Sequence, residues 1–211
     1  MPRRQADAAR ILRMIRRLVA LLAERLRPPG EAPLTEHRVV HGLPVRIENT
    51  RPDIQTEQVV ERLAAALDLI ATYAPRRHRR LRQDLAGFVV KRFACRGAFF
   101  PGPRECLVEL TFTVNPRHTL AEIAASIVHE ATHARVARRC GPLPLEQRAR
   151  EERLCRLAEL ELGLALPAGA VVVQRAQASL TLSDQEVAPA VDWTEAARRV
   201  AEADDQARHG R

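Results

Sequence analysis

The residues of this chain with the clearest chemical potential form one pentapeptide, His129-Glu130-Ala131-Thr132-His133, in a segment whose pattern predicts a helix. On a helix, two histidines four residues apart differ by only ~40° in direction and lie about 6 Å apart along the axis. Both imidazoles therefore reach one ion from the same face, whereas Glu130 is offset by ~100° and can lie beside that ion without ligating it. This is the arrangement needed for a zinc-bound water with a carboxylate as its general base.

The flanking residues define the limits of that helix. Thr119 and Glu122 have the spacing of a capping box, in which each side chain satisfies a free backbone amide of the first turn. Gly141-Pro142 is a typical helix end. Between these signals, apolar residues recur at helical spacing: Leu120, Ile123, Ala124, Ile127, Ala131 and Ala134. The sequence therefore predicts a well-formed, half-buried helix with His129 and His133 near its apolar side.

A catalytic zinc ion also needs a third protein ligand and an open position for water. The next predicted helix, Leu145 to Leu164, begins with several glutamates. A His-Glu-x-x-His helix followed by a helical glutamate resembles the zincin metallopeptidases and, among them, the gluzincins. The resemblance covers about Thr119 to Leu164 and no other part of the chain.

The resemblance implies a role for each matching residue. His129 and His133 would be zinc ligands, Glu152 the third ligand and Glu130 the general base. The implied reaction is hydrolysis of a peptide bond in a peptide or protein substrate, with Zn²⁺ as the cofactor. Some gluzincins have an aspartate four residues after the third ligand that supports a histidine. Arg156 occupies that position here, so the supporting residue stays unassigned.

Two neighbours of Glu152 remain alternatives as the third ligand. Glu151 shares a helical face with Leu154, Cys155 and Ala158, so it can also point inward. Cys155 lies three residues after Glu152 on the same face, and a cysteine thiolate is a common zinc ligand. A further departure from the zincin pattern is Arg135, where a hydrophobic residue is common two positions after the second histidine.

The net charge of +8 is carried almost entirely by arginine, since the only lysine is Lys91. The densest basic run extends from Arg76 to Arg82 and could contact phosphate groups. Aromatic residues make up only 3% of the chain, which leaves few platforms on which the bases of single-stranded nucleic acid could stack. We interpret this run as a solvated helix face, and a nucleic-acid partner is the less favoured interpretation.

The four cysteines, Cys95, Cys106, Cys140 and Cys155, form no Cys-x-x-Cys pair, and no secretory signal precedes them. Cys95 and Cys106 flank an expected hairpin turn, but reduced thiols are the simpler interpretation. We therefore expect a cytoplasmic protein. Charged residues interrupt every long apolar stretch, so no transmembrane span is expected.

The expected fold is α+β and zincin-like, with a small antiparallel sheet packed on the active-site helix and on further helices. The domain limits expected are 1–30 for an amphipathic helix and linker, 31–185 for the catalytic domain, and 186–211 for a C-terminal helix and tail. At 211 residues with 46% hydrophobic content, the chain can bury one sizeable core. The predicted strands are 38–40, 45–47, 88–93, 106–114 and 171–173, and the predicted helices beyond those above are 56–73 and 194–207.

Two other functions remain as alternatives to a zinc metallopeptidase. One is a small interaction or regulatory protein in which zinc ties two helices together without catalysis. The other is a basic, nucleic-acid-associated protein in which the pentapeptide is coincidental. For the enzyme, a donor to the developing oxyanion is also required, and the sequence offers Tyr73, Arg117 or His118 without selecting one.

Overall fold

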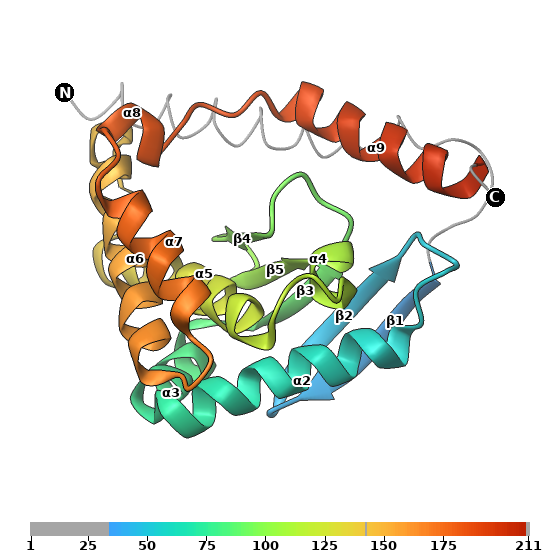
Figure 1. Ribbon diagram of the computed structural model, residues 1–211, viewed down its shortest axis with the longest axis horizontal. Coiled ribbons are helices and arrows are strands. Elements are labelled where there is room, and N and C mark those ends of the chain that lie inside the picture. The colour runs from blue at the N-terminus through green and yellow to red at the C-terminus, as the bar shows by residue number, and fades with distance from the viewer. Residues whose placement is uncertain (1–33, 142, 210–211) are drawn as a thin grey trace. The chain divides into compact units, whose positions relative to one another are not determined.

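The computed structural model describes residues 34–141 and 143–209, and Figure 1 shows how their helices and strands are arranged. The amphipathic helix expected within residues 1–30 lies outside the described residues. The described residues group as one compact unit. The segments expected as a catalytic domain, 31–185, and as a C-terminal helix and tail, 186–211, share that unit as far as they are described.

Strands β1 (Leu34–Val40) and β2 (Leu43–Asn49) form an antiparallel hairpin at the place predicted from the sequence. The two residues between them, His41 and Gly42, have φ angles of 51° and 75°. A two-residue turn in this left-handed region matches the right-handed twist of paired strands, and glycine adopts it without strain.

Two helices follow the hairpin. Helix α2 (Thr56–Tyr73) has the predicted limits, and it buries the residues at helical spacing that the sequence placed inside: Val59, Leu63, Leu67 and Ile70. Helix α3 (Pro75–Asp84) contains the arginine-rich run and begins with a proline in its first turn, where the missing amide hydrogen costs no hydrogen bond.

Strands β3 (Gly87–Lys91), β4 (Gly97–Phe100) and β5 (Glu105–Glu109) complete a five-stranded sheet in the order β1-β2-β3-β5-β4. The α+β class is confirmed, but the expected antiparallel sheet is wrong. β2, β3 and β5 run parallel to one another, and only the outer pairs β1–β2 and β4–β5 are antiparallel. The crossover through α2 and α3 carries the chain from the carboxyl end of β2 back to the end at which β2 began, so β3 runs parallel to β2. Between β3 and β5 the chain passes through β4, which lies on the far side of β5 and is antiparallel to it.

The segments expected as paired strands at 88–93 and 106–114 are neighbours, although they pair in parallel as β3 and β5. The hairpin turn expected between Cys95 and Cys106 contains β4, which forms the hairpin with β5 instead. The second strand ends early because the Glu109 side chain accepts a hydrogen bond from the Phe112 amide at 2.6 Å. This cap starts the short helix α4 (Leu110–Val114) within the predicted strand.

Helix α5 (Leu120–Cys140) carries the pentapeptide and has the predicted limits. The capping box is present, with the Glu122 amide donating to Thr119 Oγ1 at 3.2 Å and the Thr119 amide donating to Glu122 at 2.9 Å. Arg135, the departure from the zincin pattern, lies 3.6 Å from the buried Asp84 of α3, and Arg138 lies 2.7 Å from it. These two arginines therefore attach α5 to α3.

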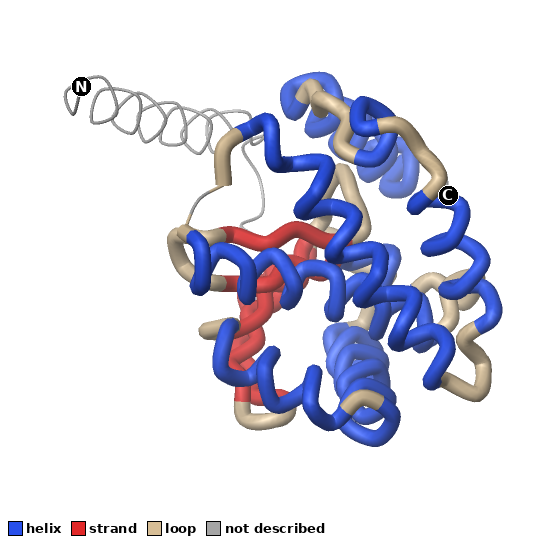
Figure 2. The backbone as a smooth tube through the Cα atoms, turned by 90° about the vertical axis from the view of Figure 1, so that its left-hand side faces the viewer, coloured by secondary structure: helices blue, strands red, loops and turns tan. Residues whose placement is uncertain are grey.

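After the helical turn η1 (Leu145–Gln147), the helices α6 (Arg148–Ala165) and α7 (Ala170–Leu180) pack on each other. The strand expected at Val171–Val173 is wrong, because these residues lie in α7. Valine favours strands locally, but a Cβ at Gly163 of α6 would lie only 3.0 Å from Val172 and Val173. The missing side chain of Gly163 lets the helices approach closely, and this packing outweighs the local preference. In Figure 2 the strands form one layer, with helices in front of it.

Helices α8 (Asp184–Val187) and α9 (Trp193–His209) complete the described chain, and α9 agrees with the predicted last helix. Arg92 joins α9 to the sheet, since it donates to Asp204 of α9 at 2.7 Å and also to Glu109 of β5. Trp193 packs on Phe93 with 5.6 Å between ring centroids. None of the described helices is both long and apolar enough to cross a membrane.

The capping box of α5 makes stability depend on pH. Burial alone would raise the pKa of Glu122, but hydrogen bonds from the Thr119 amide and His118 and the charge of Arg96 outweigh it and lower that pKa. A lowered carboxylate pKa stabilises the fold above the unfolded value of about 4.5, and this contribution is lost as pH falls through the folded value.

We therefore expect Glu122→Gln to lower the free energy of unfolding by about 1–3 kcal/mol at pH 7, measured by urea denaturation. The difference from wild type should shrink as pH falls below about 4.5. The matched control is Glu186→Gln, in the exposed capping box of α8, which should change stability far less. Equal losses in the two variants, or a Glu122→Gln deficit independent of pH, would contradict this prediction.

Candidate metal centre

His129 and His133 project from α5 toward α6, and their Nε2 atoms lie 3.2 Å apart. His129 is buried, whereas His133 is half-buried. Their imidazole ring centroids are 5.0 Å apart with the planes inclined at 63°. The helical spacing of the pentapeptide therefore brings both rings to one face, and each ring presents the same nitrogen atom to the other.

The consecutive glutamates of α6 contact different atoms of these rings. The two carboxylate oxygens of Glu152 lie 3.3 Å from His129 Nε2 and 3.6 Å from His133 Nε2. Glu151 lies 2.8 Å from His133 Nδ1, on the other side of that ring. Because neighbouring residues on a helix differ by ~100°, only one of them can face the meeting point of the Nε2 atoms. In this structure that residue is Glu152.

Carboxylates at both Nδ1 atoms orient the imidazoles. His129 Nδ1 lies 2.7 Å from Glu159, and His133 Nδ1 lies 2.8 Å from Glu151. An ionised carboxylate can only accept a hydrogen bond, so each Nδ1 donates, and in the neutral imidazole the Nε2 atom keeps its lone pair. When both imidazoles are neutral, two lone pairs and the Glu152 carboxylate converge with no proton between them. Such a group of electron-pair donors is repulsive unless a cation lies among them.

A proton and a metal ion compete for this position. Burial alone would lower the pKa of His129, but hydrogen bonds to Glu152 and Glu159 and the charge of Glu130 outweigh it and raise that pKa to about 9. Burial would likewise raise the pKa of Glu152 and of Glu159, but their contacts with His129 lower both. A metal ion bound here at neutral pH must therefore displace a proton from His129.

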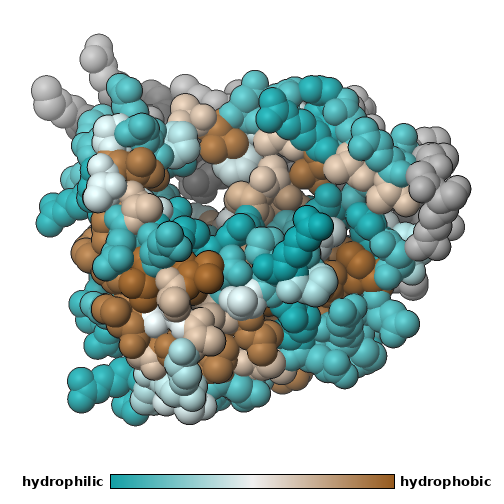
Figure 3. All heavy atoms as spheres, in the orientation of Figure 1, coloured by the Kyte–Doolittle hydropathy of each residue, from teal (hydrophilic) through white to brown (hydrophobic). Residues whose placement is uncertain are grey.

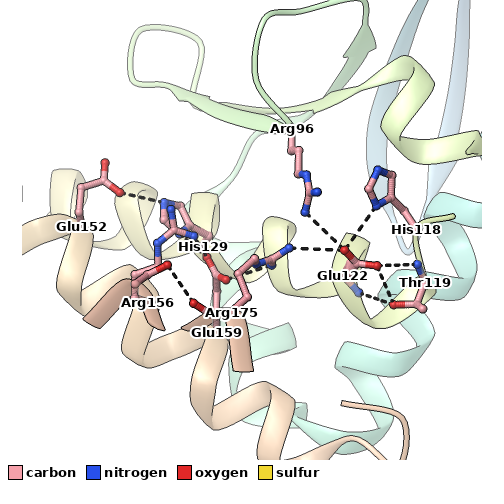
Figure 4. Close-up of polar contacts among 10 residues, drawn as sticks. Arg96, His118, Thr119, Glu122, His129, Glu152, Arg156, Glu159 and Arg175 are labelled. Carbon is pink, nitrogen blue, oxygen red and sulfur yellow. Dashed lines mark hydrogen bonds and ion pairs between the residues drawn. The ribbon is translucent and has the colours of Figure 1, made fainter. Parts of the chain in front are cut away.

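The residue that supports His129 was missed in the sequence. Glu159 is only 1% exposed, and besides His129 it contacts Arg156 at 2.7 Å and Arg175 of α7 at 3.1 Å. Figure 4 shows these contacts running from Glu152 through His129 to Glu159 and its two arginines. Arg156, which stands where some gluzincins have an aspartate, thus contributes to the site by holding this glutamate.

A signal for Glu159 was present in the sequence. Glu159 lies on the inward face of the predicted helix, next to Ala158 and four residues after Cys155. Burying a carboxylate there without a partner would destabilise the fold, so a partner is expected. Its two arginine partners could not be recognised, because Arg175 lies in the segment expected as a strand and loop. Arg175 also lies 3.7 Å from Glu122, so it connects the support of His129 with the capped start of α5.

Glu130 is 7% exposed and faces the edge strand β4. A Cβ at Gly97 of β4 would lie 3.0 Å from Glu130 Oε1 and 2.8 Å from Ser126 Oγ, so only glycine lets the strand approach this closely. Burial raises the pKa of Glu130, although the neighbouring charges of His129 and His133 oppose the rise. This carboxylate therefore lies beside the histidines, within a buried contact between α5 and β4.

Cys155 is the other side chain that reaches the histidines. Its Sγ atom and one nitrogen of each of His129 and His133 lie within 4.8 Å of one another. Cys155 is fully buried, and burial together with the charge of Glu152 raises the thiol pKa well above its usual range. All four cysteines are free thiols, with Cys95 and Cys140 exposed and Cys106 buried. Cys155 thus belongs to the cluster as a neutral thiol.

The three side chains considered as oxyanion donors lie elsewhere. His118 lies just before α5, about three helical turns before His129. Its Nδ1 atom is 3.4 Å from Glu122, and its ring packs on Phe112. Arg117 is exposed, and Tyr73 is 40% exposed at the end of α2. Among the described residues, no hydrogen bond or ion pair links these three side chains to the His129–Glu152 cluster.

Comparison of the chain with models of protein families, with curated proteins and with solved structures gives no match. The geometry and chemistry of the cluster are therefore the basis for any inference about function.

Proposed function

We propose that this protein is a zinc-dependent hydrolase, a gluzincin-like metallopeptidase in which His129, His133 and Glu152 hold the ion. One observation carries the proposal: two Nε2 atoms and one carboxylate converge on the same point, and a further carboxylate orients each histidine. Two nitrogen donors and one oxygen donor suit zinc, and three protein ligands leave a fourth position open to water.

The residues around the ligands fit hydrolysis. Bound zinc would polarise a scissile carbonyl and acidify a water molecule. Glu130, one residue after the first histidine, would accept the proton of that water and deliver it to the leaving amine. Glu159 and Glu151 would hold the imidazoles in the tautomer that presents Nε2 to the ion.

The edge strand favours an extended peptide as the substrate. β4 pairs only with β5 within the described sheet, so its outer side is the place where a further strand can pair. β4 also contacts α5 at Glu130 through Gly97. A peptide that adds to β4 by backbone hydrogen bonds would therefore run past the general base.

A second candidate function is a non-catalytic zinc site that ties α5 to α6. The observation that favours it is Cys155, whose Sγ atom lies close enough to one nitrogen of each histidine to share a metal ion with them. Closed sets with cysteine are typical of structural zinc, which has no open position for water. The buried Glu130 beside the ligands has no role in such a site, and for that reason we favour the hydrolase.

The deciding experiment is the zinc content per chain of protein purified without chelator, measured by elemental analysis. We expect about one zinc ion in wild type and in Cys155→Ala, and a loss of zinc in His133→Ala and Glu152→Ala. If Cys155→Ala lost zinc and Glu152→Ala kept it, the ligands would be the two histidines and Cys155. The proposed catalytic ligand set would then be wrong. No zinc in wild type, and none taken up on addition, would overturn the proposal.

The contact between Glu159 and His129 predicts that changing Glu159 weakens zinc binding without abolishing it. Glu159→Gln removes the charge that orients His129, so zinc affinity should fall by about 10- to 100-fold, measured by competition with a chromophoric chelator. The matched control is Glu161→Gln, two residues further along α6, because Glu161 is exposed and pairs only with Arg77 among the described residues. Unchanged affinity in Glu159→Gln would show that this carboxylate does not orient a ligand.

A further inference from the structure

A strongly basic surface lies on α3. Four of its arginines, Arg76, Arg79, Arg80 and Arg82, are exposed, whereas Leu81 and Asp84 on the opposite side of the helix are buried. Arg139, exposed at the end of α5, lies near them. We call these five arginines the basic surface.

The five arginines differ from most others in the described part of the chain. Arg92, Arg156, Arg175 and Arg198 each form ion pairs with carboxylates, and their charges are neutralised locally. No carboxylate within ion-pair distance is seen among the described residues for any arginine of the basic surface. Within the described residues, a group of arginines without ion-pair partners is therefore gathered on α3 and at the end of α5.

Contacts between α3 and α5 bring these arginines together. Arg135 and Arg138 of α5 both reach Asp84 of α3. Burial and the nearby charges of Arg139 and Arg80 lower the pKa of Arg135, so guanidinium groups from both helices lie within range of one another. Like charges gathered in this way repel one another, and an anionic partner would relieve that repulsion.

The basic surface also has a recess. A cavity of about 430 Å³ is lined by Pro75, His78, Arg79, Arg82 and Gln83. Its back is fixed by the β1–β2 turn, where His41 Nδ1 lies 3.0 Å from His78 Nε2 and a Cβ at Gly42 would lie 3.0 Å from Arg82 Nη2. Two guanidinium groups, an imidazole and an amide can donate hydrogen bonds to the oxygens of a phosphate group there.

From these observations we infer that the basic surface binds the phosphate backbone of duplex nucleic acid without reading its sequence. Arginine forks match phosphate oxygens, and the surface offers no exposed aromatic side chain of α3 on which the bases of a single strand could stack. An anionic membrane fits less well, because α3 exposes no large apolar residue to enter a lipid interface. The exposed apolar residues of α6 and α7 include Leu154, Leu157 and Val171, and Figure 3 shows hydrophobic side chains gathered over those helices instead.

The basic surface and the zinc site lie on different sides of α5. His129 and His133 face α6, whereas Arg135 and Arg138 face α3. His133 and Arg139 are separated by about 9 Å along the helix axis, given the rise of a helix per residue. Nucleic acid on the basic surface would therefore contact a different side of α5 from the one that carries the histidines. The inference goes beyond the proposed hydrolase and does not rest on it.

The test is the fluorescence anisotropy of a labelled duplex DNA of arbitrary sequence, titrated with the full chain at several salt concentrations. Wild type should bind, and five phosphate contacts predict that log K falls against log salt with a slope of about −4 to −5. Arg79→Ala/Arg82→Ala should weaken binding at least about tenfold and reduce the slope by about 2. The control Arg198→Ala/Arg199→Ala removes two exposed arginines of α9 that pair with Glu195, so its net charge changes equally but its affinity should not.

Any of the following outcomes would overturn the inference. Equal weakening in both double variants would mean that binding reflects net charge and not this surface. No duplex binding at low salt, or retention by phosphatidylserine vesicles with no retention by DNA, would assign the surface to another partner. Binding that is lost when a chelator removes zinc would place the nucleic acid at the metal site, whereas the zinc measurement tests the hydrolase independently.

Discussion

Glu130→Gln is expected to lower the rate of peptide hydrolysis by about 10²- to 10⁴-fold, the usual contribution of a general base. Glutamine has nearly the same shape as glutamate but cannot accept the proton of the attacking water. Glu130 is a buried residue of α5 in contact with β4, so no solvent-exposed carboxylate can take its place. The rate is measured by mass spectrometry on a pool of synthetic peptides. A pool contains many different side chains, so the assay works whatever side chains the site prefers.

The same variant should keep its zinc, since Glu130 lies beside the ligands and is not one of them. Elemental analysis of the assayed sample therefore separates a catalytic loss from a loss of metal. Glu161→Gln, an exposed glutamate of α6, is the control and should keep both rate and zinc. Zinc-loaded wild type that cleaves no peptide in the pool, or Glu130→Gln with an undiminished rate, would favour the structural zinc site over the hydrolase.

Gly97→Val is expected to disturb the site from β4, the strand that contacts Glu130. A Cβ at this position would lie 3.0 Å from Glu130 Oε1, 3.1 Å from Glu130 Cγ and 2.8 Å from Ser126 Oγ. Since these atoms belong to a buried contact, either β4 or the Glu130 side chain must move. We expect a loss of about 1–3 kcal/mol in the free energy of unfolding from overpacking. A displaced general base should also lower the rate by about 10²-fold.

Gly102→Val is the matched control, because a Cβ at Gly102 meets no other atom within 4 Å. It lies in the turn between β4 and β5 and should leave the rate unchanged. Thermal and urea denaturation measure stability, and the peptide assay is run well below the midpoint of unfolding. If Gly97→Val kept wild-type activity and stability, the close contact between β4 and Glu130 would not exist in solution.

The sequence alone determined the helix that carries the pentapeptide. Its limits follow from local chemistry, because a capping box and a C-terminal glycine act on adjacent backbone groups. The convergence of His129 and His133 is equally local, since helical geometry places residues four apart on one face whatever surrounds them. For the same reason, α2 and α9 could be predicted closely from their apolar spacing.

Only the tertiary structure decided which residues of α6 meet the histidines. Glu151 and Glu152 are adjacent and chemically identical, so the choice between them depends on the rotation of α6 against α5. Likewise, Arg175 reaches Glu159 only because α7 is a helix packed on Gly163, against the strand preference of its valines. Strand direction in the sheet also depends on the crossover that joins β2 to β3. Local periodicity shows which residues share a face of one element, whereas the partners of that face are set by packing between elements distant in sequence.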